Sequence, residues 1–315
     1  MTDFQDRFAR CLTLFAEARD KDGSKLSMFA FAADRGGEYA NHLFRNEDKD
    51  ADLRSVSKVV TGLVLGSLLA SDAKLGGAPI TLETRVEPLL RQHMSDAARA
   101  QWAEVRIIDL LNNTIGHEEG FLFSKDLRDL PHSEYLAYVF AAPILHPPGT
   151  HFSYSNVGPF LFSVIAQDWL GTPLYDLARA AVLGPLGVES HWRRFGEYSA
   201  GCTGLSMKNG DLIKLATLLR DGGETNGRRI VPQSWVTTMS SPVSMTPHMY
   251  DPNRVFPKHA YGIGLWVCKN GSFYCDGTNG QYLVVVRDRG VALSTTGEQP
   301  DMKPITRCMT PFVTE

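Results

Sequence analysis

The strongest constraint on the fold is a single lysine inside an apolar helix. Residues 54–71 read RSVSKVVTGLVLGSLLAS, and Lys58 is the only ionisable side chain after the first residue. Apolar residues cover most of the circumference of this predicted helix, so we expect the helix to be buried on nearly all sides. An unpaired ammonium is costly in such surroundings, and both burial and the positive end of the helix dipole should lower the pKa of Lys58.

A neutral Lys58 would be a base beside a serine. Because helix positions i and i+3 share a face, the amine can reach the hydroxyl of Ser55 and make it a nucleophile. The backbone N–H of Ser55 at the helix start could also stabilise an oxyanion. The alternative is that Ser55 caps the helix and Lys58 extends to solvent. Spacing alone does not decide, since Ser71-Asp-Ala-Lys74 repeats it in a polar segment.

A tyrosine and an asparagine mark a second segment, residues 147–162, which read PPGTHFSYSNVGPFLF. Tyr154 and Asn156 precede an apolar helix, and a phenol at a helix entry can project into a cleft and relay a proton. The alternatives are an aromatic at the edge of the core for Tyr154 and a helix cap for Asn156. The same Tyr-x-Asn spacing at 39–41 lies inside a predicted hairpin.

The pattern of the whole chain predicts an α/β (α+β) fold. An amphipathic helix over residues 4–15 and a hairpin of residues 26–33 and 38–45 precede the apolar helix. Helical signals dominate residues 73–240, and β-rich runs with Gly turns fill 261–297 as an antiparallel meander. We therefore expect one sheet subdomain from residues 1–72 and 241–315, and a helical subdomain from 73–240.

Composition excludes several classes of function. The chain has 315 residues with a net charge of −3, and its cations are dispersed, which disfavours nucleic acid as a partner. No apolar run is long enough to cross a membrane, and the N-terminal residues lack the pattern of a secretory signal, so we expect a cytoplasmic protein. Five cysteines without a CxxC pair and nine scattered histidines predict no disulfide, metal or cofactor. The oligomeric state is not indicated.

The ordered motifs resemble the serine β-lactamase and penicillin-binding-protein-like family, in particular its class C-like esterase and amidohydrolase branch. They are DLRSVSKVVTGLVLG, PPGTHFSYSNVG, GLSMKNGDLIKLATLLRDGGETNGRRIV, YGIGLW and DGTNGQYLVVV, and the similarity spans about residues 26–300. The resemblance implies a five-stranded antiparallel sheet flanked by helices, with an all-helical subdomain and the site between them. It also implies that Ser55 accepts the acyl group, Lys58 is its base, Tyr154 carries a second proton and Asn156 orients the substrate.

The third motif of that family aligns best with Cys275-Asp276-Gly277. Gly277 would permit close backbone approach, and the N–H of Thr278 would complete the oxyanion hole. The sequence departs from the family here, because Cys275 replaces the cation that helps to hold a substrate carboxylate, and Asp276 adds negative charge. A β-lactam or a D-Ala-D-Ala peptide is therefore a poorer candidate substrate. A nucleophilic role for Cys275 is disfavoured, since no histidine is near in the sequence.

Three functions follow from these residues. The first is a serine hydrolase that cleaves an ester or amide of a small molecule through an acyl-enzyme on Ser55. The second is an acyltransferase that passes the same acyl group to an amine or alcohol. The sequence does not separate them, because the difference is whether the cleft admits water or an acceptor. A non-catalytic binding protein is least favoured, because Ser55, Lys58 and Tyr154 are all present.

Overall fold

An eight-stranded antiparallel sheet is the largest element of the computed structural model, which describes residues 2–314. The N-terminal hairpin joins the C-terminal meander because β1 pairs with β17, with Phe31 opposite Thr295. The strands lie in the order β12 (Ser244–Met245), β13 (Lys258–Tyr261), β14 (Trp266–Cys268), β15 (Ser272–Gly277), β16 (Gln281–Val286), β17 (Val291–Gly297), β1 (Met28–Arg35) and β2 (Glu38–Leu43).

The expectation of five strands was wrong. The edge strands beyond β15 are short, with two residues in β12, four in β13 and three in β14. The pairing of β13 with β14 is also irregular between Lys258 and Ala260. Strands this short have no room for an alternating pattern, so they form because their backbone groups pair with the next strand rather than because of a signal in their own sequence.

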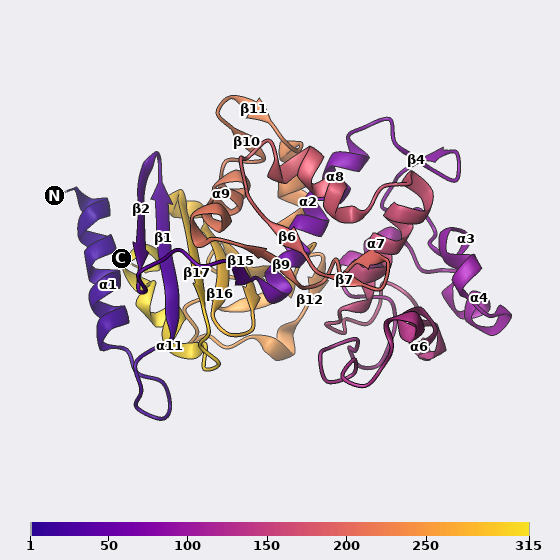
Figure 1. The fold of residues 1–315 in the computed structure, drawn as a ribbon, viewed down its shortest axis with the longest axis horizontal. Helices are drawn as coiled ribbons and strands as arrows, with labels where there is room; N and C mark the ends of the chain where they lie inside the picture. The colour runs from indigo at the N-terminus through magenta and orange to yellow at the C-terminus, as the bar shows by residue number, and fades with distance from the viewer. Residues whose placement is uncertain (1, 315) are drawn as a thin grey trace.

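Three helices cover one face of the sheet: α1 (Asp3–Glu17), α11 (Lys303–Cys308) and α12 (Thr310–Val313), seen at the left of Figure 1. A capping box formed by Thr2 and Gln5 begins α1. Its buried side carries Phe15, whose ring lies 5.2 Å from that of Phe31 on β1. The predicted amphipathic helix and its apolar face are thus confirmed, and both chain ends pack on the same face of the sheet.

The apolar helix is α2 (Ser57–Leu69), which lies at the centre of the molecule (Figure 1). All residues of 57–66 are buried, as the sequence predicted. On one side α2 contacts α7 (Val157–Leu170) and α8 (Leu174–Ala178). On the other it meets the segment between β13 and β14, where the side chain of Ile263 lies close to Gly62. Burial on both sides follows because α2 stands between the sheet and the helical region.

The helical region supplies most of the remaining helices. They are α3 (Glu87–Leu90), α4 (Asp96–Trp102), α5 (Ile107–Leu111), α6 (Tyr135–Ala141), the π-helical turn η4 (Arg179–Leu183), α9 (Asn209–Arg220) and α10 (Gln233–Met239). Helix α9 belongs to the predicted helical subdomain, yet it packs on β1, β16 and β17. The boundary at residue 240 stays a prediction.

Short strand pairs lie between these helices. A three-stranded sheet of β3 (Ala51–Asp52), β9 (Leu205–Met207) and β6 (His191–Trp192) adjoins the start of α2, where Ser57 Oγ accepts the N–H of Leu205 at 3.1 Å. The two-stranded pairs are β4 (Lys74–Leu75) with β5 (Ala78–Pro79), β7 (Arg194–Phe195) with β8 (Tyr198–Ser199), and β10 (Glu224–Thr225) with β11 (Arg228–Arg229).

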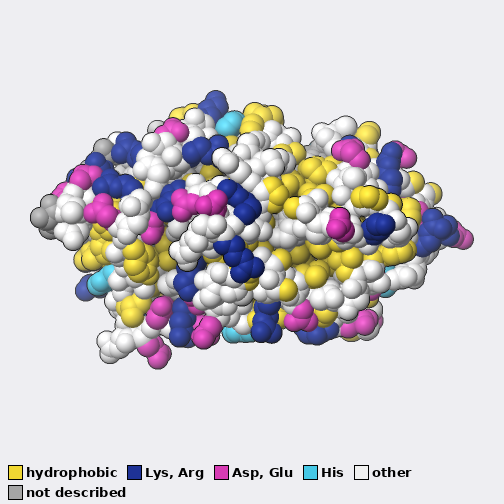
Figure 2. Space-filling model, turned by 90° about the horizontal axis from the view of Figure 1, so that it is seen from above, with side chains coloured by type: hydrophobic (Ala, Val, Ile, Leu, Met, Phe, Trp, Pro, Cys, Tyr) yellow, Lys and Arg dark blue, Asp and Glu magenta, His cyan; other side chains and the backbone are white. Residues whose placement is uncertain are grey.

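The surface carries charges of both signs. Figure 2 shows basic and acidic side chains interspersed on the face that it presents. Among the helices of residues 2–314, none combines the length and the apolar character that crossing a bilayer requires.

The packing of α2 can be tested at Gly66. A Cβ at this position would lie 2.0 Å from Cδ1 of Trp235, whose indole N–H donates to Gly62 O at 2.9 Å. Overpacking a core typically costs about 1–3 kcal/mol. We therefore expect Gly66→Ala to lower the free energy of unfolding by about 2 kcal/mol, measured by urea denaturation, although alanine is the better helix former.

The matched control is Ser67→Ala, one position along the same helix, where the side chain is only partly buried. Its free energy of unfolding should change by less than about 0.5 kcal/mol. A Gly66→Ala protein as stable as the wild type would show that α2 is not packed against Trp235 in this way.

Candidate active site

Ser55 lies in a 3₁₀ turn, η1 (Arg54–Val56), directly before α2. Arg54 has φ of 51°, a left-handed conformation that is unfavourable for a residue with a Cβ. Asp52 supports it, because its carboxylate accepts the N–H of Arg54 at 2.9 Å and pairs with the guanidinium at 3.2 Å. Strain of this kind persists only where surrounding contacts enforce it. The result is a tight turn that leaves Ser55 partly exposed at the start of a buried helix.

Lys58 is buried, with only 1% of its surface exposed. Its Nζ donates to Ser55 Oγ at 3.0 Å, to Asn156 Oδ1 at 2.7 Å and to the backbone oxygen of Cys202 at 3.1 Å. These three acceptors are neutral oxygens. Burial lowers the pKa of Lys58 below its ordinary value of 10.5, while the nearby Cys202 and other acidic groups oppose the shift. The amine is therefore held at the serine hydroxyl, in surroundings that favour its neutral form.

Tyr154 completes the contacts of Ser55. Its phenol forms a hydrogen bond with Ser55, and its ring centre lies 4.9 Å from Lys58 Nζ. The ring stacks on Trp266, with the ring centres 5.5 Å apart, and on Phe123, with the ring centres 6.5 Å apart. Burial, followed by the proximity of Cys275, raises the pKa of the phenol well above its ordinary value, and the bond from Ser55 opposes this only in part. Tyr154 is therefore protonated at neutral pH and can donate a proton.

Asn156 lies 8% exposed beside the same lysine. Its Oδ1 accepts from Lys58, and its Nδ2 donates to the backbone oxygen of Leu122 at 3.0 Å. Both ends of the amide are thus engaged within the protein, and Asn156 orients the amine. Its contact with substrate stays a prediction.

The third motif lies on β15, and its side chains alternate between two faces. The buried thiol of Cys275 donates to the backbone oxygen of Ser55 at 3.4 Å. Burial raises its pKa far above the ordinary value, so the thiol stays protonated and supports the serine turn. Asp276 points the other way and accepts the indole N–H of Trp266 at 3.0 Å. The carboxylate that we expected beside the substrate therefore contacts the ring on which Tyr154 stacks.

Gly277 lets β15 pass close to the serine turn. A Cβ here would lie 2.2 Å from the backbone oxygen of Leu53 and 2.9 Å from Cβ of Arg54. Only glycine fits such an approach. Thr278 follows at an exposed position. Of the eight predicted site residues, Ser55, Lys58, Tyr154 and Asn156 lie together. Cys275, Asp276 and Gly277 lie on β15, and Thr278 directly follows it. The participation of the Thr278 N–H in an oxyanion hole stays a prediction.

Sequence reasoning missed two contributors to this site. Cys202 had been weighed only as a thiol, but its backbone oxygen binds Lys58. Lys258 on β13 is a second buried amine, 9% exposed, with Nζ 3.7 Å from the ring centre of Trp266. Burial holds the pKa of Lys258 below its ordinary value, and the negative charge of Asp276 opposes this shift only in part. No motif marks either residue. Trp266, which lies in the YGIGLW motif, is buried and stacks on Tyr154.

The segment 110–117, LLNNTIGH, holds the loop that carries Tyr154. Asn113, at φ of 63°, accepts the N–H of Ser153 on its backbone oxygen at 2.9 Å and that of Ser155 on Oδ1 at 3.0 Å. The residues on both sides of Tyr154 are therefore fixed by one asparagine. The left-handed conformation suits Asn, which adopts it more readily than most residues with a Cβ.

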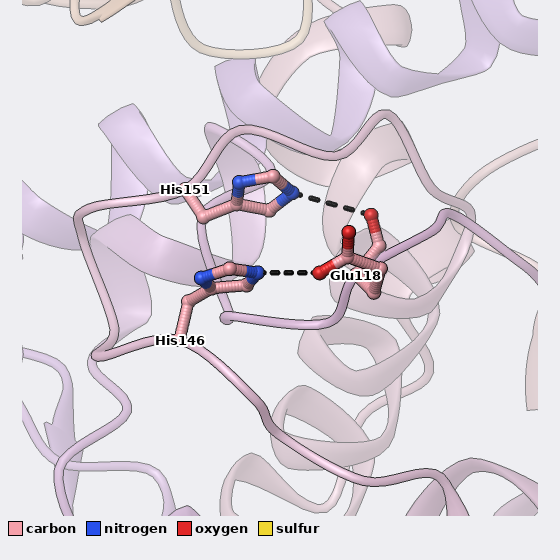
Figure 3. A group of neighbouring side chains, drawn as sticks. All are labelled: Glu118, His146 and His151. Carbon is pink, nitrogen blue, oxygen red and sulfur yellow. Dashed lines mark hydrogen bonds and ion pairs between the residues drawn. The ribbon is translucent and has the colours of Figure 1, made fainter.

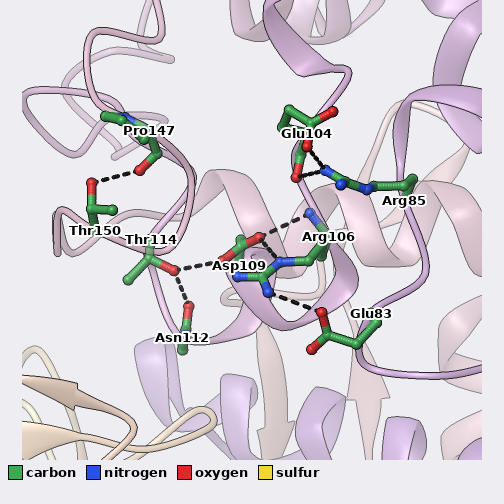
Figure 4. A network of polar contacts seen from close by, with 9 residues as sticks. All are labelled: Glu83, Arg85, Glu104, Arg106, Asp109, Asn112, Thr114, Pro147 and Thr150. Carbon is green, nitrogen blue, oxygen red and sulfur yellow. Dashed lines mark hydrogen bonds and ion pairs between the residues drawn. The ribbon is translucent and has the colours of Figure 1, made fainter.

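The residues next to Asn113 are held by the ion pair of Arg106 and Asp109, which Figure 4 shows together with Asn112 and Thr114. Asp109 is fully buried and receives two bonds from the Arg106 guanidinium, at 2.9 and 3.1 Å. It also accepts from Thr114 Oγ1 at 3.0 Å. The Asp109 contact is the main cause that raises the pKa of Arg106 above its ordinary range, so the guanidinium stays charged. The backbone of Thr114 continues the network, because its oxygen accepts the N–H of Gly149 at 2.8 Å.

Two cavities each include a residue of the site. The larger, about 380 Å³, contains Asp276 together with Arg254, Phe256, Tyr274, Tyr282 and Arg307. The smaller, about 220 Å³, contains Asn156 together with Leu122, Tyr135, Arg193 and Phe195. Aromatic walls with a few charged groups are typical of sites for small molecules.

Several solved structures have the same fold as this chain. The octameric penicillin-binding protein homologue from Pyrococcus abyssi has a TM-score of 0.75 and 16% identity, covering 98% of this chain and 76% of that one. EstCE1, described as a hydrolase with promiscuous acyltransferase activity, has a TM-score of 0.72 and 16% identity, covering 97% and 98%. A penicillin-binding protein homologue from Caulobacter crescentus has a TM-score of 0.72 and 16% identity, covering 98% and 96%. At these identities the likeness shows the fold alone.

No curated protein matches the sequence of this chain. The Beta-lactamase family matches over residues 15–303, a span that includes Ser55, Lys58, Tyr154 and the third motif. The resemblance expected from the motifs is confirmed, and the chain belongs to the Beta-lactamase family.

Proposed function

We propose that this chain is a serine hydrolase that cleaves an ester or amide bond of a small molecule through an acyl-enzyme on Ser55. One observation carries the proposal: the Nζ of Lys58 lies 3.0 Å from Ser55 Oγ, and burial lowers its pKa. A lysine in its neutral form is a base that can activate a serine. Membership of the Beta-lactamase family supports hydrolysis as the broad class of activity.

The residues divide the acylation step between them. Neutral Lys58 takes the proton of Ser55 as Oγ attacks the carbonyl carbon, and the charge that develops on the carbonyl oxygen is stabilised by the N–H groups of Ser55 and Thr278. When the bond to the leaving group breaks, Tyr154 gives that group a proton. The protonated Lys58 then restores the proton of the phenol, since both lie at Ser55.

Deacylation reverses the proton transfers with water as the nucleophile. Water attacks the acyl carbon and loses a proton to the Tyr154–Lys58 pair, and Ser55 leaves with a proton. The products are a carboxylic acid and the alcohol or amine released earlier. The N–H groups of Ser55 and Thr278 stabilise the oxyanion in this step as they do in acylation.

The third motif narrows the substrate class. Cys275 stands where the family resemblance implies a cation, and its thiol is engaged with Ser55 O. Asp276, which points the other way from β15 and contacts Trp266, supplies no cation there either. Both features disfavour a substrate that must be held by its own carboxylate, so β-lactams and D-Ala-D-Ala peptides are less favoured than neutral esters and amides. A purely binding role is also less favoured, because burying a lysine against a serine carries a cost that binding alone does not explain.

Acyl transfer is the second candidate. EstCE1, which shares the fold, is described as a hydrolase with acyltransferase activity. The same acyl-enzyme would serve both reactions, and the outcome depends on whether water or another acceptor reaches the acyl carbon.

Covalent labelling tests the nucleophile. We expect a fluorophosphonate probe to add one phosphonyl mass on Ser55, located by peptide mass spectrometry, and Ser55→Ala to abolish it. Because Ser71-Asp-Ala-Lys74 has the same spacing but is exposed, Ser71→Ala should label like the wild type. Hydrolysis of an activated ester should fall by about 10³-fold or more in Ser55→Ala. Equal labelling of Ser55→Ala would refute the assignment.

The pH dependence of hydrolysis tests the base. The reactive Lys58 is unprotonated, so kcat/KM should rise with pH as the amine loses its proton. Burial lowers this pKa, and the rise should therefore have its midpoint below the ordinary value of 10.5. Lys74→Ala, which changes the exposed lysine of the second SxxK, should keep the same profile. A midpoint at or above 10.5 would contradict a neutralised Lys58.

Product analysis separates hydrolysis from acyl transfer. The enzyme is incubated with one ester and a panel of amines and alcohols, and the products are identified by mass spectrometry. If water is the acceptor, the acid is the sole product throughout. Amide or new ester that depends on Ser55 and grows with acceptor concentration would favour the transferase.

A further inference from the structure

Three side chains with metal-binding atoms meet on two loops outside the site described above (Figure 3). His146 Nε2 lies 2.6 Å from Glu118 Oε2, and His151 Nε2 lies 3.2 Å from the backbone oxygen of Glu118. The two imidazoles stack at 4.1 Å, inclined by 18°, and Figure 3 shows both turning Nε2 toward Glu118. One ligand atom from each residue lies within 4.8 Å of the others.

The backbone holds these side chains together without an ion. The N–H of His146 donates to Gly116 O at 3.0 Å, and the N–H of Gly149 donates to Thr114 O at 2.8 Å. Gly116, at φ of 110°, permits the close approach, because a Cβ there would lie 2.2 Å from His146 O. The two loops are therefore fixed relative to each other, and a ligand set on such a frame loses little freedom on binding.

We propose that Glu118, His146 and His151 form a binding site for a divalent transition-metal ion of the zinc class, with water completing its coordination. Two imidazoles and a carboxylate are ligands that zinc prefers, whereas calcium and magnesium select oxygen ligands alone. With bonds of about 2.0–2.2 Å, the ligand atoms of a tetrahedral site lie about 3.4 Å apart. Side-chain rotations that move the ligand atoms by about 1 Å would bring the present cluster to that geometry.

The scattered histidines predicted no metal site. The structure brings two of them to Glu118, from which His146 is 28 and His151 is 33 residues away in sequence. Pairings of this kind leave no local motif.

An ion here would clamp the loop that carries Tyr154. His151 precedes Tyr154 by three residues, and Glu118 precedes Gly120, where a Cβ would lie only 1.7 Å from Tyr154 O. The ion would therefore join segments 114–121 and 146–155 from their outer side. It takes no part in the acyl chemistry, so this inference does not depend on the proposed function.

Calorimetric titration tests the site. The full chain, stripped with a chelator, is titrated with ZnCl₂, and we expect one ion per chain. His146→Gln and His151→Gln should each weaken binding at least tenfold, because each removes one of three protein ligands. His248→Gln, an exposed histidine outside the cluster, should bind like the wild type. Ser55→Ala should also bind normally, which separates this test from that of the proposed function.

Hydrogen exchange supplies the second readout. Zinc should slow amide exchange in 114–121 and 146–155 of the wild type, and should not do so in His151→Gln. Anomalous diffraction at the zinc edge should place the ion at Glu118. Three results would each overturn the proposal. They are the absence of stoichiometric zinc binding, wild-type zinc affinity in His146→Gln and His151→Gln, and an ion located away from Glu118.

Discussion

The burial of one amine organises the site. Lys58 takes its three hydrogen-bond acceptors from segments far apart in sequence: the turn before α2, the start of α7 and the loop before β9. A buried ammonium without partners would cost several kcal/mol, so these segments must converge for the fold to tolerate the lysine. The convergence places Ser55 Oγ against the amine. The same burial that makes the lysine costly to fold also favours the neutral form that could act as a base.

Tyr154 depends on a second layer of support. Asn113 fixes the backbone on both sides of it, and the Arg106–Asp109 pair and Thr114 hold the turn that contains Asn113. Trp266 stacks on the phenol ring and donates to Asp276. A change in the third motif can therefore reach Tyr154 through Trp266 as well as through the substrate. The residues Cys275 and Asp276, where the family resemblance implies a cation, therefore affect the position of Tyr154 as well as the charge near the substrate.

Much of this arrangement could be predicted from the sequence, and the rest follows from tertiary packing. The all-round burial of α2 was predictable because its apolar residues cover the helix, and the Ser55–Lys58 contact because i and i+3 share a face. Strand alternation could also have separated Cys275 from Asp276. The oxygen of Cys202 and the amine of Lys258 could not be predicted, since a backbone carbonyl carries no sequence signal and Lys258 reaches Trp266 from another strand. The short edge strands β12 and β13 were not predicted, because two to four residues leave no room for a clear alternating pattern.

The charge state of Lys58 tests this account most directly. Lysine labelled with ¹³C at Cε, followed by NMR against pH and assigned with Lys58→Met, reports the pKa of this one amine in the folded protein. The account predicts a titration below the ordinary value of 10.5, because burial penalises the charged form. A Lys58 signal that titrates at or above 10.5 would contradict it, since a fully charged amine could not take the proton of Ser55.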